Sequence, residues 1–331
     1  MTFSKDVLQL DCAAEIERIG QAMRRQLREI RRHGVVIGLS GGIDSSVTAA
    51  LAVRALGARR VFGLFMPEAD SDPESLELGQ ALAAELGLGA TIEDIAPALT
   101  ALRCYERRNA AVAAVIPGFG ADWKFKIVLP GPDHHGISYF SVVARAPDGR
   151  EVRERLPVDA YLAIVAATNF KQRVRKMVEY HWADRLNHAV AGTPNRLEYD
   201  QGFFVKQGDG AADLKPIAHL YKTQVYELAA YLGLPERIRR RPPTTDTYSL
   251  PQGQDEFYFN LSYDKLDLCL YGKNHAVPAA EVAAAAGLTA AQVERAYDDI
   301  DMKRSTTRYQ HLEPLLVEEI TGVGRAAGGN R

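Results

Sequence analysis

Residues 35–56 contain a short apolar run, a glycine-rich loop and an alanine-rich stretch, in the order VVIGLSGGIDSSVTAALAVRAL. The run at 35–39 is rich in β-branched residues and predicts a strand buried on both faces of a parallel sheet. Gly41 and Gly42 allow a tight turn and the close approach of a ligand. Ser45, together with the first N–H groups of the following helix, supplies donors for an anion. This order predicts a loop that holds a diphosphate.

Asp44 lies within this loop. Its carboxylate would repel a phosphate unless a divalent cation lay between them, so the sequence predicts Mg²⁺ there. The chain has no Gly-x-x-x-x-Gly-Lys-Ser/Thr, and no Gly-x-Gly-x-x-Gly follows the strand, which argues against transfer of a γ-phosphate. A strand-to-helix turn without a ligand would explain the two glycines alone. The full order Ser-Gly-Gly-x-Asp-Ser favours the phosphate loop.

Composition excludes several classes of function. A chain of 331 residues with 47% hydrophobic and 25% charged residues is typical of a globular protein. The net charge of -2 gives no reason to expect nucleic-acid binding, and the basic run at 237–241 is interpreted as a solvated helix end. The cysteines, Cys12, Cys104 and Cys269, lie far apart, which suits a reducing cytoplasm better than a disulfide framework. No signal core or run of 18 apolar residues occurs, so we expect neither secretion by that route nor a membrane span.

The segments around the loop alternate between helix and strand. An amphipathic helix is expected at 12–32, strands at 60–66 and 90–95, and a helix at 72–86 between them. Strands that alternate with helices form a parallel sheet with helices on both faces. The sequence therefore predicts the α/β class, with a doubly wound, Rossmann-like parallel sheet in a single domain that spans residues 1–331.

Residues 118–162 are predicted to form a β-rich insertion within that domain. The segments WKFKIVLP, SYFSVVARAPDG and REVRERLPVDAYL follow one another there, and the turn signals between them favour a β-hairpin or meander. Such an insertion is either a structural extension or subunit contact, or a lid that reshapes the pocket. Helical character is expected again at 169–191, at 220–232 and from 263 onward, and residues 322–331 are expected to be a disordered tail.

Further segments occur in the order found in one enzyme family. They are NFKQRVRKM at 169–177, GTPNRLEYDQGFFVKQGDGAADLKPIAHLYK at 192–222, PPTTD at 242–246 and DMKR at 301–304. With these segments and its Ser-Gly-Gly-x-Asp-Ser loop, the chain resembles the NAD synthetase family. That family is a branch of the N-type ATP pyrophosphatases, in the adenine nucleotide alpha hydrolase-like superfamily. Four ordered matches are more specific than one loop.

The resemblance implies an ammonia-dependent ligase that forms a carbon–nitrogen bond and uses ATP and Mg²⁺. ATP would adenylate the nicotinate carboxylate of deamido-NAD with release of pyrophosphate, and ammonia would attack the acyl adenylate to give NAD and AMP. Such activation is needed because a carboxylate is a poor electrophile. The resemblance also implies a cytoplasmic homodimer. About 34 residues precede the first expected strand, too few for a glutamine-hydrolysing domain, so free ammonia or a separate glutaminase subunit is the expected nitrogen source.

The same resemblance implies a role for individual residues. Contacts to ATP are expected from Gly38, Leu39, Ser40, Gly41, Gly42, Ile43, Asp44, Ser45, Thr193, Lys222 and Thr244. Mg²⁺ is expected on Asp44 and Glu198, deamido-NAD on Arg173, Lys206, Asp213 and Lys303, and catalytic roles for Asp44, Lys206 and Asp209. Two separated carboxylates suit a hard cation, and Asp213 could accept a hydrogen bond from a ribose hydroxyl.

Each of these residues has a simpler explanation when taken alone. Arg173 and Arg175 could lie on a solvated helix face, Glu198 could be a surface acid, and Asp209 could be a turn residue because Asp-Gly is a strong turn former. The pair Phe203-Phe204 is left open between core packing and a platform for the nicotinate ring. His134-His135 is interpreted as loop. The joint pattern, rather than any one residue, favours the site.

Two segments depart from the family pattern and leave alternatives open. The stretch at 247–260 lacks the usual acidic run ending in Glu-Leu-Gly, and Met302-Lys303 stands where relatives commonly have His-Lys. Both changes fall on the acceptor side, so a related adenylating amide ligase that acts on a different carboxylate is the first alternative. A nucleotide-binding regulatory or structural protein is the second, and Asp44 with Glu198 argues against it because a non-catalytic pocket does not need a magnesium pair.

Overall fold

The computed structural model describes residues 3–120, 122–129, 140–244, 247–253, 258–259, 261–318 and 320. A parallel sheet of order β3-β2-β1-β7 lies at the centre, built from β1 (Val35–Gly38), β2 (Val61–Phe65), β3 (Gly89–Ile92) and β7 (Ala189–Val190). The chain moves outward from β1 to β2 and β3, and then returns to the other side of β1 with β7. Such a reversal of strand order opens a crevice beyond the carboxyl ends of the strands.

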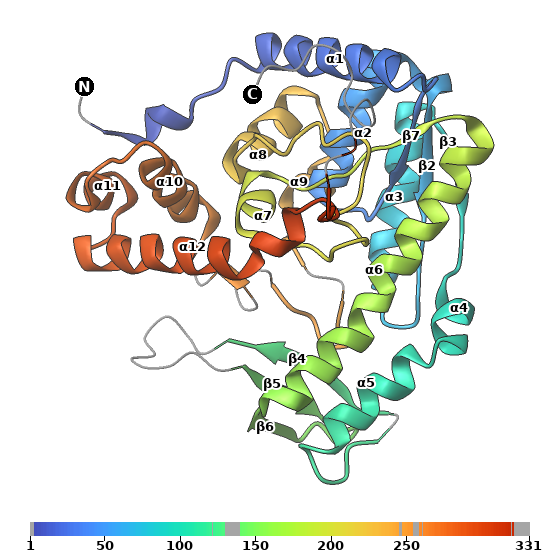
Figure 1. Cartoon of the computed structure of the whole chain (residues 1–331), viewed down its shortest axis with the longest axis vertical. Helices are drawn as coiled ribbons and strands as arrows, with labels where there is room; N and C mark the ends of the chain where they lie inside the picture. The colour runs from blue at the N-terminus through green and yellow to red at the C-terminus, as the bar shows by residue number, and fades with distance from the viewer. Residues whose placement is uncertain are drawn as a thin grey trace.

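Helices cover both faces of this sheet (Figure 1). Val35 and Ile37 point into a core shared with α1 (Cys12–Glu29), α2 (Ile43–Leu56), α3 (Pro73–Leu86) and α8 (Lys222–Tyr231). Val36, between them, points to the opposite core, which is shared with α4 (Ala96–Ala101), α5 (Cys104–Ala113) and α6 (Val158–Leu186). Successive residues of a strand face opposite sides, which explains why β1 is apolar throughout. The predicted doubly wound α/β fold is confirmed.

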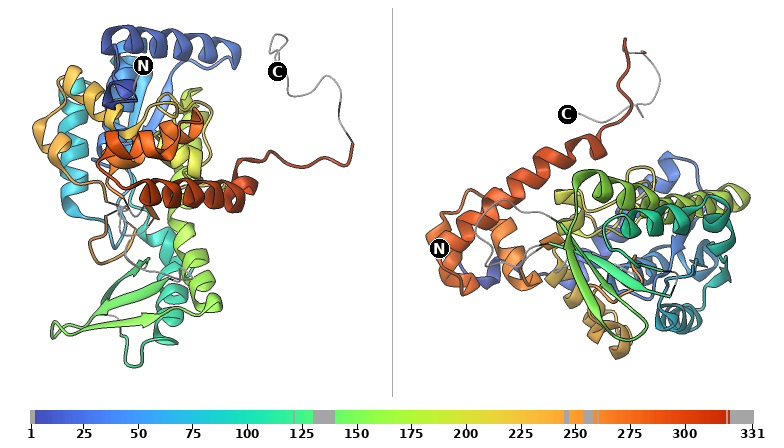
Figure 2. Two further views of the ribbon diagram at one scale, coloured as in Figure 1. Left: turned by 90° about the vertical axis from the view of Figure 1, so that its left-hand side faces the viewer. Right: turned by 90° about the horizontal axis from the view of Figure 1, so that it is seen from below.

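A group of helices packs beside the sheet as a third layer. It comprises η1 (Lys5–Leu8), α7 (Arg196–Gln201), α10 (Tyr263–Asn274), α11 (Ala279–Ala286) and α12 (Ala290–His311), which bury a separate apolar core. The remaining short helices are η2 (Ala58–Arg60) and α9 (Glu236–Arg240). Beyond α12, residues 312–318 extend away from the body (Figure 2). The tail expected to be disordered, 322–331, lies outside the described residues.

An antiparallel meander is inserted between α5 and α6. Its strands are β4 (Lys124–Val128), β5 (Ser141–Arg145) and β6 (Glu151–Arg155), in that order, and β5 pairs with both neighbours. Phe125, Ile127 and Val142 on one face pack against Val112 of α5 and Ile164 of α6. The predicted hairpin or meander is therefore present. Residues 130–139, which carry His134 and His135, lie outside the described residues.

Helix α6 begins earlier than predicted. Its first residue is Val158, whereas helix was expected only from 169, and residues 158–162 were assigned to the β-rich segment. Pro157 occupies the position before the helix with φ -59°. The fixed φ of proline is compatible with a helix start, so this proline ends the strand and begins the helix. None of the helices in the described part of the chain combines the length and apolar composition of a membrane span.

Candidate active site at the carboxyl ends of the strands

The glycine-rich loop leaves β1 at the reversal of strand order. Gly41 has φ +71°, and a Cβ atom there would lie 2.4 Å from the backbone oxygen of Ser75 in α3. Glycine adopts this left-handed conformation without strain, and it lacks the Cβ atom that would collide with α3. The loop is thereby pressed against α3 and turned toward the open end of the sheet.

The start of α2 is open to an anion. Gly42 is its N-cap, and no side chain caps the helix there. Ser45 Oγ instead donates to Gly42 O at 3.0 Å, and Ser46 Oγ donates to the same oxygen at 2.8 Å. The backbone N–H of Gly42 donates to Ser40 Oγ at 3.3 Å, which tightens the turn. The N–H groups and the dipole of α2 therefore face the site, the arrangement that binds phosphate.

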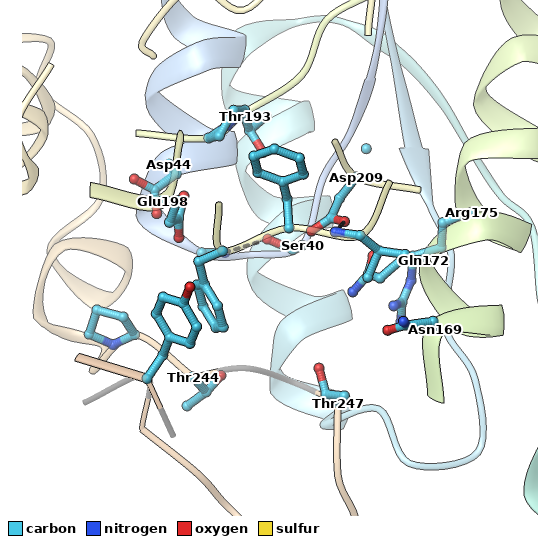
Figure 3. A pocket seen from close by; sticks show the side chains of 18 of the residues that line it. Ser40, Asp44, Asn169, Gln172, Arg175, Thr193, Glu198, Asp209, Thr244 and Thr247 are labelled. Carbon is cyan, nitrogen blue, oxygen red and sulfur yellow. Dashed lines mark hydrogen bonds between the residues drawn. The ribbon is translucent and has the colours of Figure 1, made fainter. Parts of the chain in front are cut away.

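A cavity of about 1010 Å³ lies in front of this helix end. Its walls come from segments far apart in the sequence: the β1 loop, the end of β2, α3, α6, the residues around α7, the loop at 241–248, and α12 (Figure 3). Its volume is at the upper end of the range for small-molecule sites, about 300–1,000 Å³. The crevice expected from the strand order is thus a pocket large enough for a nucleotide with a second substrate.

Asp44 and Glu198 face this cavity and are linked by Asn195. Asn195 Nδ2 donates to Asp44 Oδ1 at 3.2 Å, while Asn195 Oδ1 accepts the backbone N–H of Glu198 at 3.2 Å. Glu198 Oε2 in turn accepts the backbone N–H of Asn195 at 3.1 Å, which completes a capping box at the start of α7. Figure 3 shows the two carboxylates near one another. The fully buried Asn195 therefore sets the position of both acids.

Lys222 pairs with Asp44 from beneath the cavity wall. Its Nζ lies 2.5 Å from Asp44 Oδ2, and its side chain is 0% exposed. Burial disfavours the charge of this lysine, but Asp44 and Glu198 outweigh that effect and hold its pKa above the usual value. Lys222 does not line the cavity. Lys222 therefore affects the site through its ion pair with Asp44.

The pair Asp44 and Glu198 has the chemistry of a magnesium site. Mg²⁺ is usually held by one or two carboxylates, with waters and substrate phosphates as its other ligands. Within the described residues no group of three or more His, Cys, Asp or Glu side chains is arranged to hold a metal. The two carboxylates fit a cation that arrives with a phosphate substrate, and they do not form a complete protein cage.

Helix α6 supplies a polar face opposite these acids. Asn169, Gln172 and Arg175 line the cavity there, and Arg175 Nε donates to Met66 O at 3.4 Å (Figure 3). One turn further, Lys176 and Glu179 form an ion pair of 2.6 Å whose members are both buried. The Glu179 carboxylate lies close to the backbone at the end of β1, since a Cβ at Gly38 would approach it to 3.0 Å.

Asp209 also lines the cavity. Its Oδ1 accepts the backbone N–H of Val205 at 2.7 Å, as a turn residue would. Protein atoms surround it, and the resulting desolvation raises its pKa, yet the side chain remains open to the cavity. The turn and the ligand-facing interpretations are therefore both compatible with the structure.

Lys303 and the two phenylalanines lie at the α12 side of the cavity. Lys303 Nζ binds Asp299 Oδ2 at 2.6 Å and Tyr258 O at 2.5 Å, and burial lowers its pKa. Phe203 stacks on Tyr258 with ring centroids 4.6 Å apart, and Phe204 lies edge-on to His311 at 5.0 Å. Both phenylalanines also line the cavity, so they serve packing and site together.

Five predicted residues do not line the cavity: Gly41, Arg173, Lys206, Asp213 and the buried Lys222. Arg173 Nε donates to Lys206 O at 3.3 Å on the exposed side, and Lys206 Nζ donates to Tyr309 O at 2.7 Å. Asp213 Oδ2 accepts the backbone N–H of Val190 at 2.7 Å beside β7. The other predicted ATP and metal residues line the cavity.

Comparison with known proteins agrees with this architecture. The sequence pattern of the family described as NAD synthase matches residues 15–114 and 152–309. The chain belongs to the NAD synthase family. A protein named NH(3)-dependent NAD(+) synthetase from Rhizobium meliloti (strain 1021) is 59% identical over 321 residues, which are 97% of this chain and 96% of that protein.

Two solved structures share the fold of this member of the NAD synthase family. The NMN synthetase from Francisella tularensis has a TM-score of 0.66 at 23% identity and covers 93% of this chain and 99% of its own. The NH3-dependent NAD synthetase from Campylobacter jejuni subsp. jejuni NCTC 11168, in complex with the nitrate ion, has a TM-score of 0.62 at 23% identity and covers 93% and 100%. At this identity the likeness concerns the fold alone. The family match leaves out residues 115–151, which include β4 and β5.

Several charged residues of the cavity wall were not predicted from the sequence. The basic run at 237–241 was interpreted as solvated, but the Arg241 side chain is 11% exposed, donates to Ser75 Oγ at 2.9 Å and lines the cavity. Three polar residues of α6 were also not identified as site residues from the sequence: Gln172, Lys176 and Glu179. A signal for them exists, because polar residues at spacings of three and four place one polar stripe on a helix.

Proposed function

We propose that this protein is an ammonia-dependent NAD synthetase, a ligase that amidates deamido-NAD at the expense of ATP. The observation that carries the proposal is the 59% identity, across nearly the whole chain, to a protein named NH(3)-dependent NAD(+) synthetase. The open N-terminus of α2 at the edge of a large cavity supports it, because the reaction releases pyrophosphate and needs a place to hold that group.

In this proposal ATP binds with its β- and γ-phosphates at the start of α2. The N–H groups there and the hydroxyl of Ser40 are the donors, and Thr193 and Thr244 supply further hydroxyls from the surrounding wall. Ser45 also lines the cavity, and its hydroxyl would have to turn away from Gly42 O to donate to a phosphate. Asp44 and Glu198 would hold Mg²⁺, which neutralises phosphate charge when it is bound. Lys222 forms an ion pair with Asp44 and fixes that carboxylate in place.

The proposed reaction has two steps. A carboxylate oxygen of the nicotinate attacks the α-phosphorus of ATP, and the bond from that phosphorus to the pyrophosphate oxygen breaks. Ammonia then attacks the acyl carbon, AMP leaves with its electron pair, and the nitrogen loses a proton. We assign Asp209 to the second step, as the carboxylate that binds ammonium and accepts its proton, because its side chain lines the cavity.

The acceptor substrate is assigned to the α12 side of the cavity. Lys303 lines that side, with Phe203 and Phe204 available for contact with an aromatic ring. Arg173, Lys206 and Asp213 remain proposed substrate contacts; the first two lie near the surface, where a long dinucleotide would emerge from the cavity. We further propose that the protein acts as a cytoplasmic homodimer and takes free ammonia.

Product analysis tests the proposal. Purified protein is incubated with ATP, Mg²⁺, ammonium and deamido-NAD, beside controls that each lack one component, and the nucleotides are identified by mass spectrometry. Formation of NAD, AMP and pyrophosphate in equal amounts, at about 1 per second or faster, is expected. In parallel, nicotinate mononucleotide replaces deamido-NAD; faster turnover on that smaller carboxylate would overturn the assignment of the acceptor.

A further inference from the structure

A buried lysine lies directly behind the cavity wall. The side chain of Lys171, in α6, is 1% exposed, yet its Nζ makes three short contacts. It donates to Glu68 Oε1 at 2.9 Å, to Asp70 Oδ2 at 2.6 Å, and to the backbone oxygen of Thr247 at 2.8 Å. An ammonium group has three donors, so each of them is used.

These contacts join three segments that form walls of the cavity. Glu68 and Asp70 follow β2, whose end contributes Met66 and Pro67 to the cavity. Lys171 lies beside Gln172 and Thr168, which line it from α6, while Thr247 lines it from the loop after α9. The ammonium group of Lys171 therefore links the end of β2 and the loop after α9 to α6.

The acids around Lys171 are themselves held from α5. Tyr105 Oη donates to Glu68 Oε2 at 2.9 Å, and Arg108 forms an ion pair with Asp70. Two cations and two anions thus form a compact buried cluster. A cluster of this kind is poor evidence for stability, because desolvation opposes the attraction, and its attested use is to specify one arrangement.

The same loop has a second support in the inserted sheet. The backbone N–H of Phe125 in β4 donates to Ser249 Oγ at 2.9 Å, and the N–H of Leu250 donates to Phe125 O at 3.1 Å. Gln252 Nε2 donates to Ile127 O in the same strand. A bridge between Thr244 and Gly253 closes the base of the loop. The outer edge of β4 is thereby covered by residues 249–252.

We propose that Lys171 is a positioning residue. Together with β4 it holds residues 247–253, of which Thr247 and Tyr248 line the cavity, so that the hydroxyls of Thr244 and Thr247 are presented to the nucleoside triphosphate. The inserted sheet then takes part in the site as a support for this loop. The position of the loop does not depend on the reaction, but the identity of the ligand rests on the proposed function.

Hydrogen exchange of the loop, followed by mass spectrometry, tests this role in the full-length protein. Lys171→Met keeps the length of the side chain but removes its donors. We expect exchange of residues 247–253 to rise about tenfold, the effect of losing one charged hydrogen bond, while exchange in β1 stays unchanged. The KM for ATP should rise by about the same factor, and Lys171→Arg should restore part of both effects.

Tyr105→Phe is the matched control, because it removes a hydrogen bond to Glu68 in the same cluster but none to the loop. It should lower the melting temperature without changing loop exchange or the KM for ATP. If Lys171→Met does not fold, Ser249→Ala provides the second test, with the same expected rise in loop exchange. The proposal is overturned if loop exchange stays at the wild-type level in whichever variant folds, or if Tyr105→Phe changes it equally. Because exchange is read without turnover, a wild-type protein that made no NAD would refute only the proposed function.

Discussion

Gly41 carries the sharpest steric constraint of the glycine-rich loop after β1. Its φ of +71° and the 2.4 Å approach of a Cβ to Ser75 O leave no room for alanine. We therefore expect Gly41→Ala to cost about 1–3 kcal/mol in unfolding free energy. Because the loop must shift away from α3, pyrophosphate release should fall by about 100-fold or more. Urea unfolding and a pyrophosphate assay measure the two effects.

Gly57 supplies the control for that prediction. It also has a positive φ, +84°, but it lies at the far end of α2 and a Cβ there meets no atom within 4 Å. Gly57→Ala should lose stability through backbone strain alone and should keep wild-type turnover. Equal loss of activity in the two variants would mean that strain, rather than the shape of the loop, explains the first result.

Single residues taken from ordered motifs did not all reach the cavity. Asp44, Glu198, Thr193 and Thr244 line it, whereas the motif residues Arg173, Lys206 and Asp213 do not. Arg241 was misinterpreted because a basic run in one sequence does not reveal that its last member turns inward to Ser75. The burial of Arg241 depends on a partner, Ser75, that lies 166 residues away in the sequence.

Among the elements, α7 is short but sets the geometry of both proposed magnesium ligands. Its capping box runs through Asn195, which also donates to Asp44. Asn195→Ala should lower stability by about 1 kcal/mol through the lost cap. It should also raise the Mg²⁺ concentration needed for half-maximal activity about tenfold, as expected when a residue that orients metal ligands is removed. Magnesium titrations of initial rate measure this shift.

Thr289 offers a matched cap for comparison. It begins α12 with a capping box of the same kind, formed with Gln292. Thr289→Ala should cost similar stability and leave the magnesium curve where it is in the wild type. A magnesium curve unchanged in Asn195→Ala, with the expected stability loss, would contradict the role of Asn195 between the two acids.

Elements were predicted best where the period of the sequence was clear. The strand β1, the helix α2 and the alternation around them follow from burial on both faces, and the structure has them. The start of α6 was placed too late because the segment 158–168, VDAYLAIVAAT, is apolar almost throughout and shows no amphipathic period. It packs against the inserted sheet through Ile164. Tertiary contacts decided the structure of that segment.

At the scale of the whole molecule, the cavity lies where separate cores meet. The sheet core ends at Leu39, the helical core contributes Tyr258, and the core of the inserted sheet contributes Tyr248. From the sequence, the family resemblance was enough to assign the predicted site residues to one function. It could not show that the inserted sheet reaches the cavity, because Leu129 and Phe140 carry no motif.

The buried cluster behind this junction predicts how the whole molecule responds to acid. Burial alone would raise the pKa of Asp70, but Lys171 and Arg108 outweigh it and hold the pKa below the usual value. The unfolded chain therefore binds this proton more readily than the folded chain. The contribution of Asp70 is fully present above about pH 4, the value in the unfolded chain, and is lost as the pH falls further.

Asp70→Asn removes this dependence. At pH 7 the variant should be less stable by about 3 kcal/mol, because a buried ion pair loses one partner. Below about pH 4 its unfolding free energy should fall less steeply than that of the wild type. Urea unfolding between pH 3 and pH 7 gives both curves, and parallel curves would show that Asp70 does not carry the acid sensitivity.

The central claim is that the loop before α2 holds pyrophosphate while a carboxylate is adenylated. The most direct measurement uses deamido-NAD labelled with ¹⁸O in its nicotinate carboxylate, turned over with ATP, Mg²⁺ and ammonium, with mass spectrometry of the nucleotide and phosphate products. Attack of a carboxylate oxygen on the α-phosphorus predicts one ¹⁸O atom in AMP and none in pyrophosphate. Label in inorganic phosphate, with ADP as the nucleotide product, would contradict the account.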